Sequence, residues 1–147
     1  MTLDEILDFV GALDGVLPLS PAPGDGTPEI SWGDTFFYYA PDCTVPTTAQ
    51  PFATVVTKDY PGDASSRLDR PGFFRVNMAA GKAAFTEWTA DAPGDPSAVD
   101  AVITHPVYGG MGWLAVVNPG ARTETVTRDL LRTAHHLARA RHERRAG

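Results

Sequence analysis

The stretch Phe73-Phe74-Arg75-Val76-Asn77-Met78 is the segment from which the fold of this chain can be worked out. Successive side chains of a β-strand point to opposite faces of its sheet. This alternation places Arg75 and Asn77 together on one face and a fully apolar set on the other. The apolar set has the better claim to the core, and it consists of Phe74, Val76 and Met78.

Three more segments are rich in β-branched and aromatic residues and are typical of strands. Gly33-Asp34 lies inside the first of them, where it is either a bulge or a tight turn that makes a hairpin. If that segment is aromatic on both faces, one face meets the core and the other could meet a pocket, but core packing or a dimer surface is the better expectation for any single ring. The segments span about residues 30–40, 52–58 and 112–118.

Helical patterns flank and interrupt these strands. Thr2 and Glu5 have the spacing of a capping box, which marks the start of the first helix. The last helix has Thr123 at its expected N-cap and carries one apolar stripe. We predict helices at about residues 3–13, 81–90 and 123–144, and an irregular loop at 18–29.

The length of 147 residues is that of one domain, so residues 1–147 are expected to fold as a single unit. The order helix, strands, helix, strand, helix favours the α+β class. We therefore predict a small antiparallel sheet packed with N-terminal, middle and long C-terminal helices.

The charge of the chain argues against nucleic acid as its partner. The net charge is −6, with a balance of −10 over residues 1–121 and of +4 over residues 122–147. Phosphate backbones are bound by clustered cations, which the acidic body does not offer. The start of the chain lacks the pattern of a signal peptide, and no run approaches the ~20 apolar residues of a membrane span. We expect a cytoplasmic protein that binds no membrane.

Two groups of residues are candidates for a functional site. Arg75 and Asn77 project from the same sheet face, beside the strand that bears Lys58, and this geometry could bind a carboxylate or phosphate through charge-assisted hydrogen bonds. The alternative is a solvated outer face on which Arg75 pairs with an aspartate. The aspartates considered are Asp34, Asp59 and Asp69.

The second group lies in the loop before the last strand. His105 is a candidate general acid–base and Tyr108 could polarise a ligand oxygen, while Trp113 supplies an apolar wall. Glycines at 109, 110 and 112 would let the backbone approach a ligand closely. The alternative is that His105, which precedes Pro106, only stabilises the turn as a hydrogen-bond donor. A ligand site, if present, is predicted where this loop meets Arg75 and Asn77.

No strong catalytic or metal-binding motif is present. A phosphate-binding loop, a dinucleotide fingerprint, a nucleophile elbow and a zinc-protease helix are all missing from the sequence. His135 and His142 share a face of the last helix, but they lie too far apart for one metal without another ligand. We expect neither a metal nor a cofactor.

The residues resemble a family of small actinobacterial proteins carried as a domain of unknown function. The resemblance extends from the first predicted helix to the last. It is carried by WGDTFFYYAPD (32–42), QPFATVVTKDYPGD (50–63), SRLDRPGFFRVN (66–77) and HPVYGGMGWLAVVNP (105–119).

The order of elements is also similar to that of the MmcQ/YjbR-like group. The shared features are a G-x-x-F segment at 33–36, a strand ending at Lys58, and a late strand, G-W-L-A-V at 112–116, that differs from the usual pattern at Leu114. That resemblance implies a double-wing fold, sometimes called DNA-binding, and one member of the group binds an antibiotic.

We expect a small-molecule binding protein linked to natural-product metabolism or self-resistance. The alternative is a cofactor-independent enzyme that performs hydrolysis, isomerisation or cyclisation with a loop histidine, and a homodimer is a further expectation.

Overall fold

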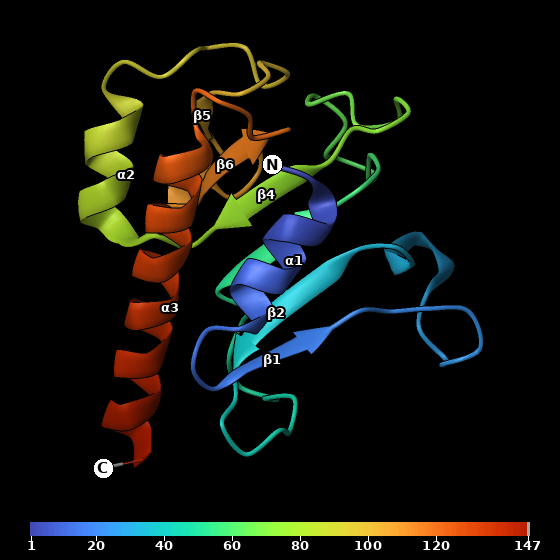
Figure 1. Cartoon of the computed structure of the whole chain (residues 1–147), viewed down its shortest axis with the longest axis vertical. Coiled ribbons are helices and arrows are strands. Elements are labelled where there is room, and N and C mark those ends of the chain that lie inside the picture. The colour runs from blue at the N-terminus through green and yellow to red at the C-terminus, as the bar shows by residue number, and fades with distance from the viewer. Residues whose placement is uncertain (147) are drawn as a thin grey trace.

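The computed structural model describes residues 1–146, and over this range the chain forms a six-stranded antiparallel sheet and three α-helices (Figure 1). The strand order is β1-β2-β3-β4-β6-β5. The strands are β1 (Val16–Leu19), β2 (Thr35–Tyr39), β3 (Ala53–Val56), β4 (Arg75–Met78), β5 (Val102–Thr104) and β6 (Leu114–Val117). The helices are α1 (Leu3–Gly11), α2 (Gly81–Thr89) and α3 (Glu124–Ala146). The predicted α+β class is confirmed.

The helices cover one face of the sheet, and the main core lies between the two layers. In Figure 1, α1 and α3 lie in front of the sheet, and α3 runs along the longest axis of the molecule. From α1 come Ile6 and Val10, and from α3 come Leu130, Leu131 and Ala134. Their partners on the sheet include Phe37, Val55, Val76, Met78 and Val116. The alternation in residues 73–78 thus sends its apolar set to the helices, as predicted.

The N-terminal region corrects two predictions. The capping box is present, with Glu5 N donating to Thr2 Oγ1 at 3.1 Å and Thr2 N donating to Glu5 Oε1 at 3.0 Å. However, α1 ends at Gly11, and a strand, β1, covers part of the segment predicted as loop 18–29. The sequence analysis did not predict this strand because it contains Pro18, and proline lacks the N–H group that strand pairing uses. At the edge of a sheet that loss is tolerated, and Pro18 pairs with Phe37 there.

The aromatic segment at 30–40 contains neither a bulge nor a hairpin. A 3₁₀ turn spans Glu29–Ser31, and strand β2 begins only at Thr35. Gly33 between them has φ of +88°, which favours glycine. Asp34 follows and is fully buried; it accepts hydrogen bonds from Thr57 N and Thr57 Oγ1, both at 2.8 Å. The segment is therefore a turn held by a buried carboxylate.

The C-terminal half adds an edge strand, β5, that the sequence analysis did not predict. Strand β5 pairs with β6, Ile103 opposite Ala115. Asp100, just before β5, caps the start of α3. It accepts hydrogen bonds from Gly120 N at 2.8 Å and from Thr123 N at 3.0 Å. The remaining boundaries differ from the predicted ones by a few residues.

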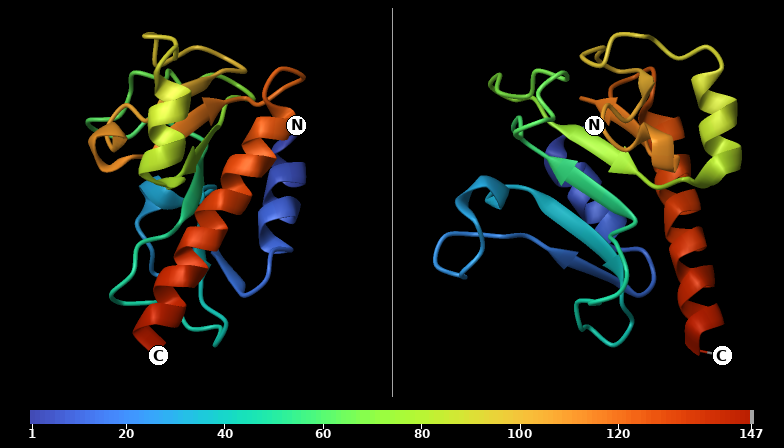
Figure 2. Two further views of the ribbon diagram at one scale, coloured as in Figure 1. Left: turned by 90° about the vertical axis from the view of Figure 1, so that its left-hand side faces the viewer. Right: turned by 180° about the vertical axis from the view of Figure 1, so that it is seen from behind.

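Loops cover only part of the opposite face of the sheet, which is seen from behind in Figure 2. Beneath these loops a smaller core forms over β6, β5 and the end of β3. Its buried members are Val56, Leu68, Ile103, Ala115 and Val117. The part of this face over β2, β3 and β4 is left for the cavity described below. Among residues 1–146, no helix is long and apolar enough to cross a membrane.

Candidate functional site

A cavity of about 840 Å³ lies on the face of the sheet opposite the helices. Its floor is formed by β2, β3 and β4, and its walls by the turn at residues 60–63 and the loop at residues 105–113. The volume is within the range of small-molecule sites. Side chains with rings or an aliphatic surface share the lining with a small polar cluster.

Strand β2 explains the aromatic character of the cavity. Phe37 is buried among the core residues, whereas Phe36 and Tyr38 line the cavity on the other face. Burial raises the pKa of Tyr38, so its hydroxyl stays protonated at neutral pH. The double-sided aromatic pattern in the sequence thus corresponds to one core face and one pocket face, which was one of its expected meanings.

Arg75 is the centre of the polar cluster and is only 1% exposed. Its Nε donates to Asn77 Oδ1 at 2.7 Å, and its Nη1 donates to Asp63 Oδ1 and to Ser66 Oγ, each at 3.0 Å. Its Nη2 donates to Asp63 Oδ2 at 2.6 Å and lies 3.2 Å from His105 Nε2. Four of the five guanidinium N–H groups thus donate to acceptors of the protein, and the fifth, on Nη2, points toward His105 Nε2.

Small neighbours on the same face make room for this buried arginine. Arg75 lies between Val56 of β3 and Val117 of β6, and Asn77 lies between Thr54 and Ala115. Asn77 Nδ2 donates to Thr54 Oγ1 at 2.9 Å, which fixes the orientation of its amide. The amide oxygen is thereby presented to Arg75.

Asp63 is held ionised by this arrangement. Burial alone would raise the pKa of Asp63, but the hydrogen bonds and positive charge of Arg75 outweigh burial and lower it. The carboxylate is thus committed to the guanidinium by a two-point contact.

His105 is 3% exposed and has a defined tautomer. Its Nδ1 lies 3.0 Å from both Val107 N and Tyr108 N, whose N–H groups point at it. An N–H group can only donate, so Nδ1 is the acceptor and the ring proton is on Nε2. Burial, and then the nearby charge of Arg75, lowers the pKa of His105 to about 4. The ring is therefore neutral at pH 7.

The loop after His105 forms an aromatic rim, defined here as Tyr108, Met111 and Trp113. The ring centroids of His105 and Tyr108 are 5.0 Å apart, and those of Tyr108 and Trp113 are 6.3 Å apart. Met111 is 75% exposed at the mouth of the cavity. The rim gives the cavity an apolar entrance beside its polar cluster.

Gly109 is required by the packing of this loop. A Cβ atom at this position would lie 2.3 Å from Thr104 Cγ2 of β5. Gly110, in contrast, has open space around it. Of the loop glycines, Gly109 is the one that lets the loop lie against β5 and place His105 at the cavity.

The structure brings together most of the residues that the sequence nominated. Arg75, Asn77, His105, Tyr108 and Trp113 all line one cavity, at the predicted meeting of sheet face and loop. The three aspartates that the sequence analysis considered as partners of Arg75 do not contact it. Its carboxylate partner is a fourth aspartate, Asp63. Asp34 instead pairs with Lys58, Asp59 accepts from Leu68 N, and Asp69 accepts from Asp59 N.

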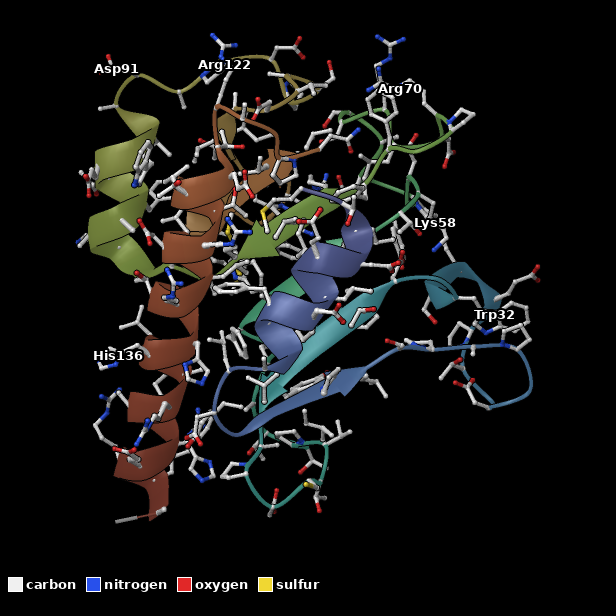
Figure 3. All side chains as sticks on the ribbon, in the orientation of Figure 1. Trp32, Lys58, Arg70, Asp91, Arg122 and His136 are labelled. Carbon is white, nitrogen blue, oxygen red and sulfur yellow. The ribbon has the colours of Figure 1, made fainter. Side chains whose placement is uncertain are left out.

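Lys58 does not line the cavity. Strand β3 ends at Val56, so the alternation that would have placed Lys58 beside Arg75 does not continue to residue 58. Its Nζ lies 3.0 Å from Asp34 Oδ1 and donates to Trp32 O at 2.7 Å. Lys58 and Trp32 are labelled on the same side of the molecule in Figure 3. Lys58 thus stabilises the turn before β2.

Asp63 and Tyr60 were missed by the sequence analysis. They flank a turn whose central residues are Pro61 and Gly62, with Gly62 at φ of +80°. Pro-Gly is a recognisable signal of such a turn. The turn is closed by hydrogen bonds between the backbones of Tyr60 and Asp63, at 2.9 and 3.1 Å. Nothing in the local pattern indicated that the turn folds back over the sheet to Arg75.

The cluster has no composition suited to a metal. Within residues 1–146 there is no group of three or more His, Cys, Asp or Glu side chains that could hold a metal ion. The His135 ring, on α3, lies in an edge-to-face arrangement with the Tyr39 ring, with centroids 5.6 Å apart.

Comparisons with known proteins place the chain in one family. No curated protein and no solved structure matches it, so the likeness to the MmcQ/YjbR-like group stays a prediction. A model of DUF6194, described as a family of unknown function, matches residues 1–147. The expectation of a domain of unknown function is thereby confirmed, and the chain belongs to the DUF6194 family.

Proposed function

We propose that this protein binds a small organic molecule in the cavity between the sheet and the loop at residues 105–113. The observation that carries the proposal is the convergence of aromatic walls and a buried polar cluster in one cavity. Ligand sites commonly combine a mostly apolar lining with a few placed polar groups. The cavity has this composition on one sheet face.

The polar cluster suits binding because it is already organised. Arg75 is held by Asp63, Asn77 and Ser66, so a ligand meets side chains that need little reordering. Preorganised groups reduce the entropy lost on association. The aromatic rim supplies apolar area close to these groups.

Catalysis is the second candidate function, and the same convergence favours it. His105, Tyr108 and Arg75 reach one cavity, as a cofactor-independent enzyme with acid–base chemistry would require. Two features count against it. The unprotonated Nδ1 of His105 is occupied by backbone N–H groups, and Asp63 is engaged by Arg75, so neither offers a free base. Binding therefore ranks ahead of hydrolysis, isomerisation or cyclisation.

The resemblance to the MmcQ/YjbR-like group supports a ligand from natural-product metabolism, with self-resistance as one role. The acidic balance of residues 1–121 supports the expectation that nucleic acid is not the partner. A homodimer is a further proposal, and sedimentation of the purified protein would test it.

A fragment screen by ligand-observed NMR tests the proposal. Aromatic fragments should bind, and Trp113→Ala should weaken them at least several-fold because it removes a cavity wall. Trp88→Ala is the matched control, since Trp88 is exposed on α2 and is not part of the cavity lining. The proposal is wrong if no fragment binds, or if both tryptophan variants lose binding equally.

A further inference from the structure

Resting on the proposed function, we propose a chemical class for the ligand: a planar aromatic compound that presents an uncharged carbonyl-type oxygen to His105. The oxygen would accept a hydrogen bond from His105 Nε2–H beside Arg75 Nη2, while the ring system lies against the aromatic residues of the cavity.

The first step of the argument is the position of the imidazole proton. Two backbone N–H groups, of Val107 and Tyr108, converge on Nδ1 at 3.0 Å each. A proton on Nδ1 would point at these two backbone N–H groups, which are also donors, and would break both contacts. Nε2 consequently carries the hydrogen, and His105 offers the cavity a donor and no acceptor.

The second step is the contact between His105 and Arg75. Nε2 lies 3.2 Å from Arg75 Nη2. With the proton on Nε2, both atoms are donors, so this short contact is not a hydrogen bond. Both side chains line the cavity and are almost fully buried. An acceptor oxygen on the cavity side of these two atoms has two lone pairs and can take a hydrogen bond from each. Buried donors favour a ligand that supplies this acceptor.

The third step concerns charge. Asp63 neutralises Arg75 through the two-point contact, and His105 is neutral, so the cluster has no net charge. A ligand carboxylate would bring an unbalanced negative charge into a buried site beside the carboxylate of Asp63. Burying an unpaired charge is costly. An uncharged oxygen, such as that of a ketone, quinone or amide, satisfies the donors without this cost.

The fourth step concerns the body of the ligand. Phe36 and Tyr38 on β2 and Trp113 on the rim line the same cavity as His105. Aromatic rings pack favourably against other rings in stacked and edge-on arrangements. A fused bicyclic ring with a carbonyl substituent matches both parts of the lining.

Three naphthalenes substituted at the same position test the ligand class. One carries an acetyl group, one an isopropenyl group of nearly the same shape, and one a carboxylate. The acetyl compound should bind about 3- to 10-fold more tightly than the isopropenyl compound, the worth of one net hydrogen bond. The carboxylate should bind more weakly than the acetyl compound. Affinities would be measured by quenching of tryptophan fluorescence and repeated by calorimetry.

Two variants of His105 test its donor role at Nε2 separately from its acceptor role in the turn. In His105→Asn the amide oxygen can replace Nδ1 as acceptor for the backbone N–H groups, but the donor at Nε2 is lost. In His105→Gln the amide nitrogen can replace the donor, but the acceptor for the turn is lost. His105→Asn should keep the melting temperature and lose the preference for the acetyl compound. His105→Gln should lower the melting temperature and keep the preference for the acetyl compound.

The ring-nitrogen chemical shifts of His105, measured by NMR, report the tautomer directly. A proton on Nδ1 would overturn the inference. If the acetyl and isopropenyl compounds bind equally, and both depend on Trp113, the inference fails and the proposed function stands. If the carboxylate binds most tightly, the uncharged class is wrong. If none of the three binds and the fragment screen is also negative, both proposals fail.

Discussion

Asp63 and Arg75 form an ion pair with two parallel contacts, Nη2 to Oδ2 at 2.6 Å and Nη1 to Oδ1 at 3.0 Å, in which the Arg75 side chain is buried and that of Asp63 is 16% exposed. The pair joins the turn at residues 60–63 to β4, which lies inside the sheet. It thereby fixes one wall of the cavity relative to its floor. Stability and ligand binding should both depend on this contact.

Asp63→Asn should lower the free energy of unfolding by about 3 kcal/mol. The substitution leaves the Arg75 charge buried without a counter-charge, and breaking a buried pair from one side is strongly destabilising. Urea denaturation of the two proteins measures the difference. Asp91→Asn is the control, because Asp91 is exposed and its replacement should change little. The double variant Asp63→Leu with Arg75→Met, which removes both charges, should be more stable than Asp63→Asn, and a still less stable double variant would contradict the argument.

The free energy of unfolding should decrease as the pH is lowered through the range in which His105 titrates. Its pKa is about 4 in the folded protein and about 6.5 when unfolded. Because the folded value is lower, the contribution to stability is complete above pH 6.5 and is lost as pH falls toward 4. The loss would be at most about 3 kcal/mol over that window. Unfolding free energies at several pH values, compared between the wild type and His105→Asn, isolate this residue. Equal pH profiles would show that His105 does not titrate as described.

Gly109→Ala should disturb the loop that carries His105, whereas Gly110→Ala should not. The new methyl group at 109 would overlap Thr104 Cγ2, and a forced fit of this kind costs about 1–3 kcal/mol. The methyl group at 110 would meet open space. Melting temperatures and affinity for the acetyl naphthalene should fall for the first variant alone. Similar behaviour of the two variants would mean that the loop does not require this close packing.

Asp100→Ala should destabilise the start of α3. Asp100 accepts from Thr123 Oγ1 at 2.6 Å, as well as from the backbone N–H groups of Gly120, Arg122 and Thr123. Burial opposes ionisation, but these hydrogen bonds prevail and lower the pKa of Asp100. Loss of a helix cap costs about 1–2 kcal/mol. Glu87→Ala, on the exposed side of α2, is the control for thermal melting. Unchanged melting of Asp100→Ala would show that α3 does not depend on this cap.

Local sequence patterns were enough to find the elements whose signals lie within a few residues. The capping box at Thr2 and Glu5 marks the start of α1, and the alternation at residues 73–78 identifies both faces of β4. Edge strands were less visible. Strand β1 includes a proline and β5 has three residues, so each is a strand mainly because a neighbour, β2 or β6, pairs with it.

The sequence by itself determined that Arg75 and Asn77 share the face opposite the core, since the two-residue period of a strand requires it. It also determined that a glycine-rich loop carries His105. Only the tertiary structure decided which aspartate meets Arg75 and that Lys58 lies elsewhere. Asp34 accepts hydrogen bonds from Thr57 and Asp59 accepts one from Leu68 N, whereas Asp63, whose turn folds over the sheet, contacts Arg75. Pairing of this kind depends on how loops cross the sheet, which is set by long-range packing and not by local spacing.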